Sequence, residues 1–292
     1  MGKATREAYG NALARIGKEN TNIIVLDADL SKSTKTDTFK AVCPERFFNV
    51  GIAEQNLISV GAGLAAAGKI PFVSSFSMFA TGRAFEQIRN AVCYPKLNVK
   101  VCATHAGITV GEDGATHQSL EDISCMRTLP NMTVVVPADE RETEAVIEWA
   151  ASYNGPVYVR LGRAGVDDVT TEGYSFVPGK STILVDGSDA TIIACGALVG
   201  PAVEASKTLS ESNISARVIN MASIKPIDAE AIIKAATETG AIVTAEEHNI
   251  IGGLGSAVSE VVVSNKPVPM EFVGVQDTFG ESGTPKELMA KY

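Results

Sequence analysis

The stretch Thr104–Gln118 reads THAGITVGEDGATHQ and concentrates the reactive side chains of the chain. It holds two of the three histidines, His105 and His117, on either side of the acidic pair Glu112 and Asp113. Glycines flank the acidic pair, and glycine permits backbone angles and close approaches that other residues do not. Because such a loop is entropically costly to order, its composition predicts either a solvated turn or a site whose ligand offsets that cost.

Short apolar strands and helical segments alternate on both sides of this loop. Val99–Ala103 predicts the strand that delivers the loop, and Ile23–Leu26 predicts a buried strand ending at Asp27-Ala28-Asp29. Further strands are expected at 47–50, 71–75, 133–136 and 156–160, with helices at 4–19, 53–68, 120–127 and 140–151 and one through 91. The polar segment 31–37 is expected to be a loop. This alternation predicts a mostly parallel, doubly wound sheet.

The chain length of 292 residues fits two domains at roughly 150 residues each. We expect the first domain at 1–164, a linker at 165–185 that loses the apolar periodicity, and a second doubly wound domain at 186–292. The motif GGLGSAV at Gly252–Val258 resembles half of a dinucleotide fingerprint. Its spacing and the lack of a suitable downstream acid favour a tight turn with close helix packing.

Composition excludes several classes of protein. The net charge of −9 argues against nucleic acid as a partner, but it is compatible with a small local pocket for one phosphate. Five scattered cysteines without a CxxC pair favour reduced thiols and a cytoplasmic location. We find no secretory signal, and the most apolar stretch, Leu57–Ala67, is about 11 residues long, too short to span a bilayer.

Polar and aromatic residues near the strand ends are expected to converge, because the carboxyl ends of parallel strands share one edge of the sheet. They are Asp29, Ser33, Glu54, Phe79, His105, Asp113, His117 and Arg160. A zinc site is one alternative, but its ligands Cys102, His105, Asp113 and His117 match no common spacing. A Ser-His-Asp hydrolase is disfavoured because the chain has no GxSxG elbow. We expect no metal site formed by this chain alone.

Several segments are similar to the transketolase family. VGIAEQN (Val50–Asn56), PFVSSFSMF (Pro71–Phe79), the 104–118 loop and VVVPAD (Val134–Asp139) resemble its pyrimidine-binding domain. The segment from about residue 185, including EEHNIIGGLGSAV, resembles its C-terminal domain. The resemblance covers essentially the whole chain and implies an α/β fold with these two doubly wound domains. It also implies transfer of a two-carbon ketol unit from a ketose phosphate to an aldose phosphate, as in the pentose phosphate pathway.

The resemblance also indicates what this chain lacks. Thiamine diphosphate enzymes hold the diphosphate and Mg²⁺ in a separate domain through a GDG motif, and no GDG occurs here. The resemblance therefore implies the C-terminal subunit of a split transketolase, active only with an N-terminal subunit that carries the diphosphate and Mg²⁺ site. It further implies self-association into an α2β2 heterotetramer, which agrees with the run of small residues in the helix at 53–68.

Roles follow from the resemblance at matching positions. Glu54 matches the glutamate that hydrogen-bonds N1′ of the cofactor's aminopyrimidine, Phe79 the ring that stacks on it, and Phe76 a ring lining the same pocket. His117 matches the histidine that contacts the donor's C1 hydroxyl and assists proton transfer, and Asp113 the residue that reads the C2 hydroxyl.

Three further positions, Ser33, His105 and Arg160, match residues that bind the substrate phosphate, which suits their donor chemistry. One position departs from the family pattern: the tyrosine that completes the pyrimidine pocket in some members is Gly82 here, next to Arg83. The resemblance leaves the sugar substrates open. The alternatives are a 2-oxo acid-cleaving thiamine enzyme, such as a dehydrogenase E1 β subunit or a deoxyxylulose-phosphate synthase, and a non-catalytic regulatory paralogue.

Overall fold

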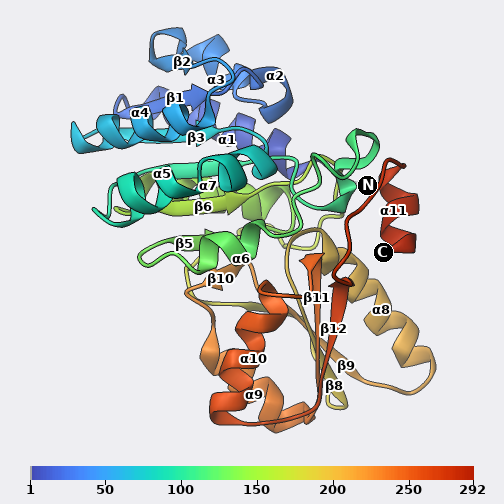
Figure 1. Ribbon diagram of the computed structural model, residues 1–292. Helices are drawn as coiled ribbons and strands as arrows, with labels where there is room; N and C mark the ends of the chain where they lie inside the picture. Colours follow the sequence, from blue (N-terminus) through green and yellow to red (C-terminus); the bar gives the residue numbers. More distant parts are fainter. Residues whose placement is uncertain (1) are drawn as a thin grey trace.

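β-Branched, apolar runs in the first half of the chain form the central strands of a seven-stranded sheet in the computed structural model, which describes residues 2–292 (Figure 1). The strand order is β10-β5-β6-β4-β3-β1-β2, and every pair is parallel except β10–β5. The strands are β1 (Ile23–Asp27), β2 (Phe47–Asn49), β3 (Ile70–Ser74), β4 (Lys100–Ala103), β5 (Thr133–Val135), β6 (Val157–Arg160) and β10 (Ser223–Lys225). The predicted mostly parallel sheet is confirmed.

Helices cover both faces of this sheet. α1, α3 and α7 pack together on one face, and α4, α5 and α6 lie on the other (Figure 1). The helical segments are α1 (Thr5–Glu19), α2 (Ser31–Thr34), α3 (Asp37–Val42), η1 (Pro44–Arg46), α4 (Glu54–Ala66), η2 (Met78–Arg83), α5 (Phe85–Gln87), η3 (Ile88–Cys93), η4 (Ile108–Asp113), α6 (Asp122–Arg127) and α7 (Glu140–Ser152). Because β1 to β6 are parallel, their carboxyl ends lie at one edge of the sheet, which is the edge where ligands bind in such folds.

The second half of the chain forms a five-stranded sheet in the order β12-β11-β8-β9-β7, in which only β7 and β9 are antiparallel. Its strands are β7 (Thr182–Val185), β8 (Ala190–Ala194), β9 (Ala216–Asn220), β11 (Ile242–Asn249) and β12 (Met270–Val275). Its helical segments are η5 (Gly196–Leu198), α8 (Val199–Glu211), α9 (Ala229–Thr239), α10 (Leu254–Asn265) and α11 (Pro285–Lys291).

The two halves are joined by more than a linker. β10 comes from the second half of the chain but pairs with β5 at the edge of the first sheet. One hydrophobic cluster contains buried side chains from both halves, including Val134 and Val136 with Ile219 and Met221. The two halves therefore share a continuous core.

Two local expectations differ from the structure. The segment 31–37, expected to be a loop, begins with the helical turn α2, and the expected linker at 165–185 contains strand β7. α2 forms because the buried Asp27 carboxylate accepts hydrogen bonds from Leu30 N at 2.6 Å and Thr34 Oγ1 at 2.7 Å, which fixes the turn. Within residues 2–292, no helix combines the length and apolar character needed to cross a membrane.

The GGLGSAV segment is a tight turn that opens α10, as predicted. Glu246 accepts hydrogen bonds from Leu254 N at 2.7 Å and Gly255 N at 2.8 Å, so its carboxylate satisfies the free N–H groups of the helix. A side chain at Gly255 would meet Phe272 Cδ1 at 2.5 Å. Gly255 therefore allows α10 to pack closely against β12.

Candidate active site

Glu54 is the first residue of α4 and is almost completely buried, with 1% of the residue exposed. Its position in the first helical turn favours a negative charge. Glu54 Oε2 accepts a hydrogen bond from Arg83 Nη1 at 2.7 Å. The Arg83 guanidinium also lies over the ring of Phe79, with its Cζ atom 5.2 Å from the ring centroid. A buried carboxylate and an aromatic face thus hold one flat cation between them.

The two predicted phenylalanines contact both histidines of the 104–118 loop. Phe76 follows β3 and stacks on His105, with centroids 3.8 Å apart and planes 22° apart. Phe79 lies in η2 and meets the ring of His117 edge-on at 5.2 Å. Through Arg83 and Phe79, Glu54 is connected to His117 by direct contacts. The structure therefore brings Glu54, both phenylalanines and both imidazoles to one edge of the sheet.

His105 is buried and its hydrogen bonds define its tautomer. Its Nε2 lies 3.2 Å from Arg6 Nη1, and its Nδ1 lies 2.8 Å from Thr104 Oγ1. A guanidinium only donates, so Nε2 is the acceptor and Nδ1 carries the proton that is donated to Thr104. Burial lowers the pKa of His105 to about 3, and the positive charges of Arg6 and Arg163 act in the same direction. The imidazole is therefore neutral at pH 7.

Two arginines that the sequence analysis did not single out form a cationic patch beside His105. Arg6 donates to Ser33 O at 3.0 Å, and its Nε is buried without a hydrogen-bond partner among residues 2–292. Burial, together with the charge of Arg163, lowers the pKa of Arg6. Two guanidiniums held close together with a free donor are typical of an anion site. Arg6, Arg163, Ser33 and His105 make up this patch.

Arg163 reaches the same place from the segment that follows β6. It donates to Val110 O, pairs with Glu112 at 3.1 Å and lies 3.9 Å from Asp113 Oδ2. The Asp113 side chain is 43% exposed, so its carboxylate stays accessible on the outer side of the loop. Arg163 lies three residues beyond Arg160, where β6 ends, so its position just after a strand was the sequence signal for it.

Arg160 has surroundings different from those expected of a phosphate ligand. Its side chain is 6% exposed, and its Nε pairs with the fully buried Asp122 at 2.7 Å. Its Nη2 donates to Glu247 O at 2.8 Å. Because this guanidinium is directed to the junction between the two halves of the chain, Arg160 lies outside the group formed by His105, Arg6 and Arg163.

The remaining strand-end candidates are also placed. Asp29 is exposed and accepts a hydrogen bond from Asn49 Nδ2 at 2.8 Å. Cys102 is buried within β4, and burial raises its pKa to about 12, so this thiol is a core residue. Across residues 2–292, no three histidine, cysteine, aspartate or glutamate side chains are grouped so that they could hold a metal ion.

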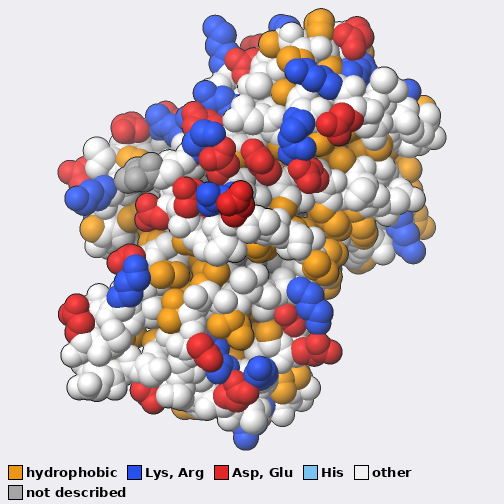
Figure 2. All heavy atoms as spheres, turned by 180° about the vertical axis from the view of Figure 1, so that it is seen from behind, with side chains coloured by type: hydrophobic (Ala, Val, Ile, Leu, Met, Phe, Trp, Pro, Cys, Tyr) orange, Lys and Arg blue, Asp and Glu red, His pale blue; other side chains and the backbone are white. Residues whose placement is uncertain are grey.

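Figure 2 shows the face of the molecule that lies behind the view of Figure 1, and acidic and basic side chains lie next to each other on it. Hydrophobic side chains gather on the side where α4 and α5 lie. The exposed apolar residues on or next to α4 include Phe48, Ile52 and Val60, which are 47%, 77% and 37% exposed. They lie on β2, on the connection to α4 and on α4 itself.

Comparisons with known proteins identify the family. Residues 1–167 match the model of the transketolase pyrimidine-binding domain, and residues 179–292 match that of the transketolase C-terminal domain. The chain is 54% identical over 99% of its length to the "Putative transketolase C-terminal section" of Methanocaldococcus jannaschii, covering 92% of that protein. It is 41% identical over 99% of its length to a subunit of the apulose-4-phosphate transketolase of Phocaeicola vulgatus, covering 93% of that subunit.

A solved structure described as a split gene transketolase, an inactive beta4 tetramer, is 58% identical to this chain. It superimposes with a TM-score of 0.94, over 100% of this chain and 94% of that chain. The chain therefore belongs to the transketolase family and spans the pyrimidine-binding and C-terminal domains, as the C-terminal sections of split members do.

Proposed function

We propose that this chain is the C-terminal subunit of a thiamine-diphosphate-dependent transketolase that transfers a two-carbon ketol unit from a ketose phosphate to an aldose phosphate. The observation that carries the proposal is the position of Glu54. The residue is 1% exposed and lies at the edge of the sheet that also holds His105 and His117. A buried carboxylate beside an aromatic face and two imidazoles suits proton transfer at a bound heterocycle.

The residues around Glu54 fit the pyrimidine part of the cofactor. Arg83 supports this fit, because its guanidinium is flat, donates an N–H group to Glu54 and lies over Phe79. A protonated aminopyrimidine has the same flat shape and the same kind of donors. When bound, thiamine diphosphate supplies the carbon nucleophile and the electron sink. Glu54 would share a proton with the pyrimidine nitrogen, and Phe79 and Phe76 would orient the ring.

The loop and the cationic patch fit the sugar phosphate. His117 is half-buried and Asp113 is exposed, so both side chains are accessible to hydroxyl groups of the substrate. Arg6 and Arg163 would supply cationic donors for its phosphate group beside Ser33, and the neutral His105, whose ring nitrogens contact Arg6 and Thr104, would hold Arg6 in place. We assign Arg160 to holding the two halves of the chain together in place of its expected role in phosphate binding.

We infer the assembly from the GDG motif for the diphosphate and Mg²⁺, which this sequence lacks. We propose an N-terminal partner subunit that holds the diphosphate and Mg²⁺, a cytoplasmic α2β2 complex, and a place in pentose phosphate metabolism. The exposed apolar residues Phe48, Ile52 and Val60 support self-association at the α4 side of the domain.

The test is reconstitution. The chain is mixed with a GDG-bearing subunit from the same genome, thiamine diphosphate and Mg²⁺, and is assayed with xylulose 5-phosphate or with pyruvate as donor. We expect ketol transfer from xylulose 5-phosphate in the mixture and none from either subunit alone. Turnover of pyruvate instead would identify a 2-oxo acid-cleaving enzyme. No turnover in the mixture, while a complete transketolase responds to added chain, would identify a regulatory paralogue.

A further inference from the structure

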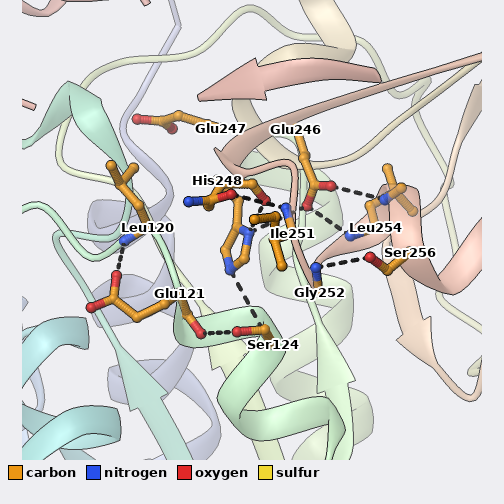
Figure 3. Close-up of polar contacts among 12 residues, drawn as sticks. Leu120, Glu121, Ser124, Glu246, Glu247, His248, Ile251, Gly252, Leu254 and Ser256 are labelled. Atoms are coloured by element: carbon orange, nitrogen blue, oxygen red, sulfur yellow. Dashed lines mark hydrogen bonds and ion pairs between the residues drawn. The ribbon is translucent and has the colours of Figure 1, made fainter. Parts of the chain in front are cut away.

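The loop that carries both imidazoles is held by a carboxylate from the other half of the chain. Glu247, near the end of β11, accepts a hydrogen bond through Oε1 from the backbone N–H of Thr109 at 2.6 Å. Glu247 is 5% exposed and Thr109 is 7% exposed. The adjacent Glu246 points in the opposite direction, toward the start of α10 (Figure 3), as alternate side chains of a strand do.

The backbone of the loop is shaped to receive this carboxylate. A Cβ atom at Gly107 would lie 2.3 Å from the carboxyl carbon of Glu247, and Gly107 has a φ of +84°. A side chain at Gly107 would therefore displace the carboxylate and strain the backbone. Gly107 N donates to Ser119 O at 2.9 Å, and this hydrogen bond joins the two ends of the loop at its neck. Gly107 and Glu247 form a matched contact at that neck.

Arg160 holds the backbone of Glu247. Its Nη2 donates to Glu247 O at 2.8 Å and to Ser119 O at 3.4 Å, while its Nε pairs with Asp122. The guanidinium thus connects the backbone of Glu247 with the C-terminal end of the loop. The Glu247 side chain holds the N-terminal part of the same loop. Both ends of the loop are therefore held by Glu247, a residue of the C-terminal domain.

We propose that Glu247 is a positioning residue that sets the geometry of the 105–118 loop and, through it, the substrate contacts of His105, Asp113 and His117. This inference rests on the proposed function. Glu247 does not touch the substrate pocket residues themselves, so its effect is on loop order. A displacement of about 1 Å at reacting groups costs up to about 100-fold in rate. The C-terminal domain thereby contributes to catalysis without supplying a catalytic group.

Three variants separate this role from general stability. Glu247→Leu removes the acceptor but keeps the volume, and it is tolerable because Glu247 borders a cavity of about 60 Å³ with largely apolar walls that include Ile108, Leu198 and Val275. Glu247→Gln keeps an acceptor oxygen. Glu246→Gln is the matched control, because Glu246 is a neighbouring buried glutamate that caps α10 and does not contact the loop.

The first experiment is hydrogen exchange on the isolated full chain. We expect faster exchange in peptides covering 105–118 for Glu247→Leu, wild-type exchange there for Glu247→Gln, and any change in Glu246→Gln confined to α10. Unchanged exchange of the loop in Glu247→Leu would overturn the proposal. This readout needs neither cofactor nor activity, so it is independent of the proposed function.

The second experiment is steady-state kinetics in the reconstituted complex. We expect Glu247→Leu to lower kcat/KM for the sugar phosphate about 10–100-fold, with restoration in Glu247→Gln. The apparent affinity for thiamine diphosphate should not change, because Glu54 and Phe79 lie on α4 and η2. An active wild-type complex with unchanged Glu247→Leu kinetics would overturn the positioning role. A wild-type complex without ketol transfer would overturn the proposed function instead.

Discussion

Arg83 and Glu54 form an ion pair in which one partner is exposed and the other is not. The Nη1–Oε2 distance is 2.7 Å, and the side chains are 51% and 2% exposed. The guanidinium also lies over Phe79. Arg83 therefore makes the two contacts that we propose for the aminopyrimidine, and it neutralises a carboxylate that is otherwise removed from water.

Replacing Arg83 should make the cofactor more important for stability. In Arg83→Ala the buried Glu54 loses its partner, so we expect a lower Tm without cofactor. Thiamine diphosphate would then provide the missing partner, so the rise in Tm on adding cofactor to the reconstituted complex should be larger than in wild type. The measurement is differential scanning fluorimetry with and without the cofactor. A smaller rise would indicate that Arg83 is itself part of the cofactor site.

Removing the acid of Glu54 should abolish most of the activity while preserving the fold. Glu54→Gln keeps the shape and an acceptor for Arg83 but cannot share a proton with the pyrimidine nitrogen. We expect kcat of the reconstituted complex to fall about 10²–10⁴-fold. The measurement is ketol transfer under saturating cofactor, with Glu45→Gln as a control because Glu45 is an exposed glutamate of the same domain. Near-normal turnover in Glu54→Gln would remove the mechanism.

The convergence of Glu54, Phe79, His105 and His117 could be predicted because it follows from topology. Glu54, Phe79 and His105 follow the ends of β2, β3 and β4 within a few residues, His117 lies in the loop that follows β4, and parallel strands bring such ends to one edge. The apolar, β-branched runs also predicted the central strands. These features are local in sequence, so no knowledge of tertiary packing was needed.

What could not be predicted depends on contacts between distant segments. β10 is a three-residue strand whose pairing with β5 exists only once both halves are packed. Whether Arg160 or Arg163 faces the site depends on the buried Asp122, which attracts the former. Arg6 lies in α1, away from any strand end, and reaches His105 only through the packing of that helix.

The lowered pKa of His105 predicts a specific loss of stability in acid. Burial, then Arg6 and Arg163, lower this pKa to about 3, whereas an unfolded histidine titrates near about 6.5. The unfolded chain therefore binds a proton more readily, and stability from neutral His105 is complete above about pH 6.5 and declines as the pH falls toward 3.

The check is the urea midpoint of wild type and His105→Asn between pH 7 and pH 4.5. Asparagine suits the left-handed backbone at this position, where φ is 57°. We expect the wild-type midpoint to fall more steeply with decreasing pH than the variant midpoint. Equal slopes would show that His105 titrates in the folded protein as it does in the unfolded chain.

Substitution by methionine should affect substrate binding at Arg163 and stability at Arg160. Arg163→Met removes a half-exposed donor of the cationic patch, so KM for a phosphorylated donor should rise about 10–100-fold, the equivalent of losing one charged hydrogen bond. Its Tm and its activity toward an unphosphorylated ketose should remain near wild type. Steady-state kinetics with a matched pair of phosphorylated and unphosphorylated donors measures this difference.

Arg160→Met should instead act on stability, because it leaves the carboxylate of Asp122 buried at 0% exposure without its cation. Breaking a buried pair in this way costs about 3–5 kcal/mol. We therefore expect a clear fall in Tm in thermal unfolding, and a KM for the donor phosphate that changes less than in Arg163→Met. If Arg160→Met instead raised KM selectively for phosphorylated donors at an unchanged Tm, the phosphate site would have to be moved back to Arg160.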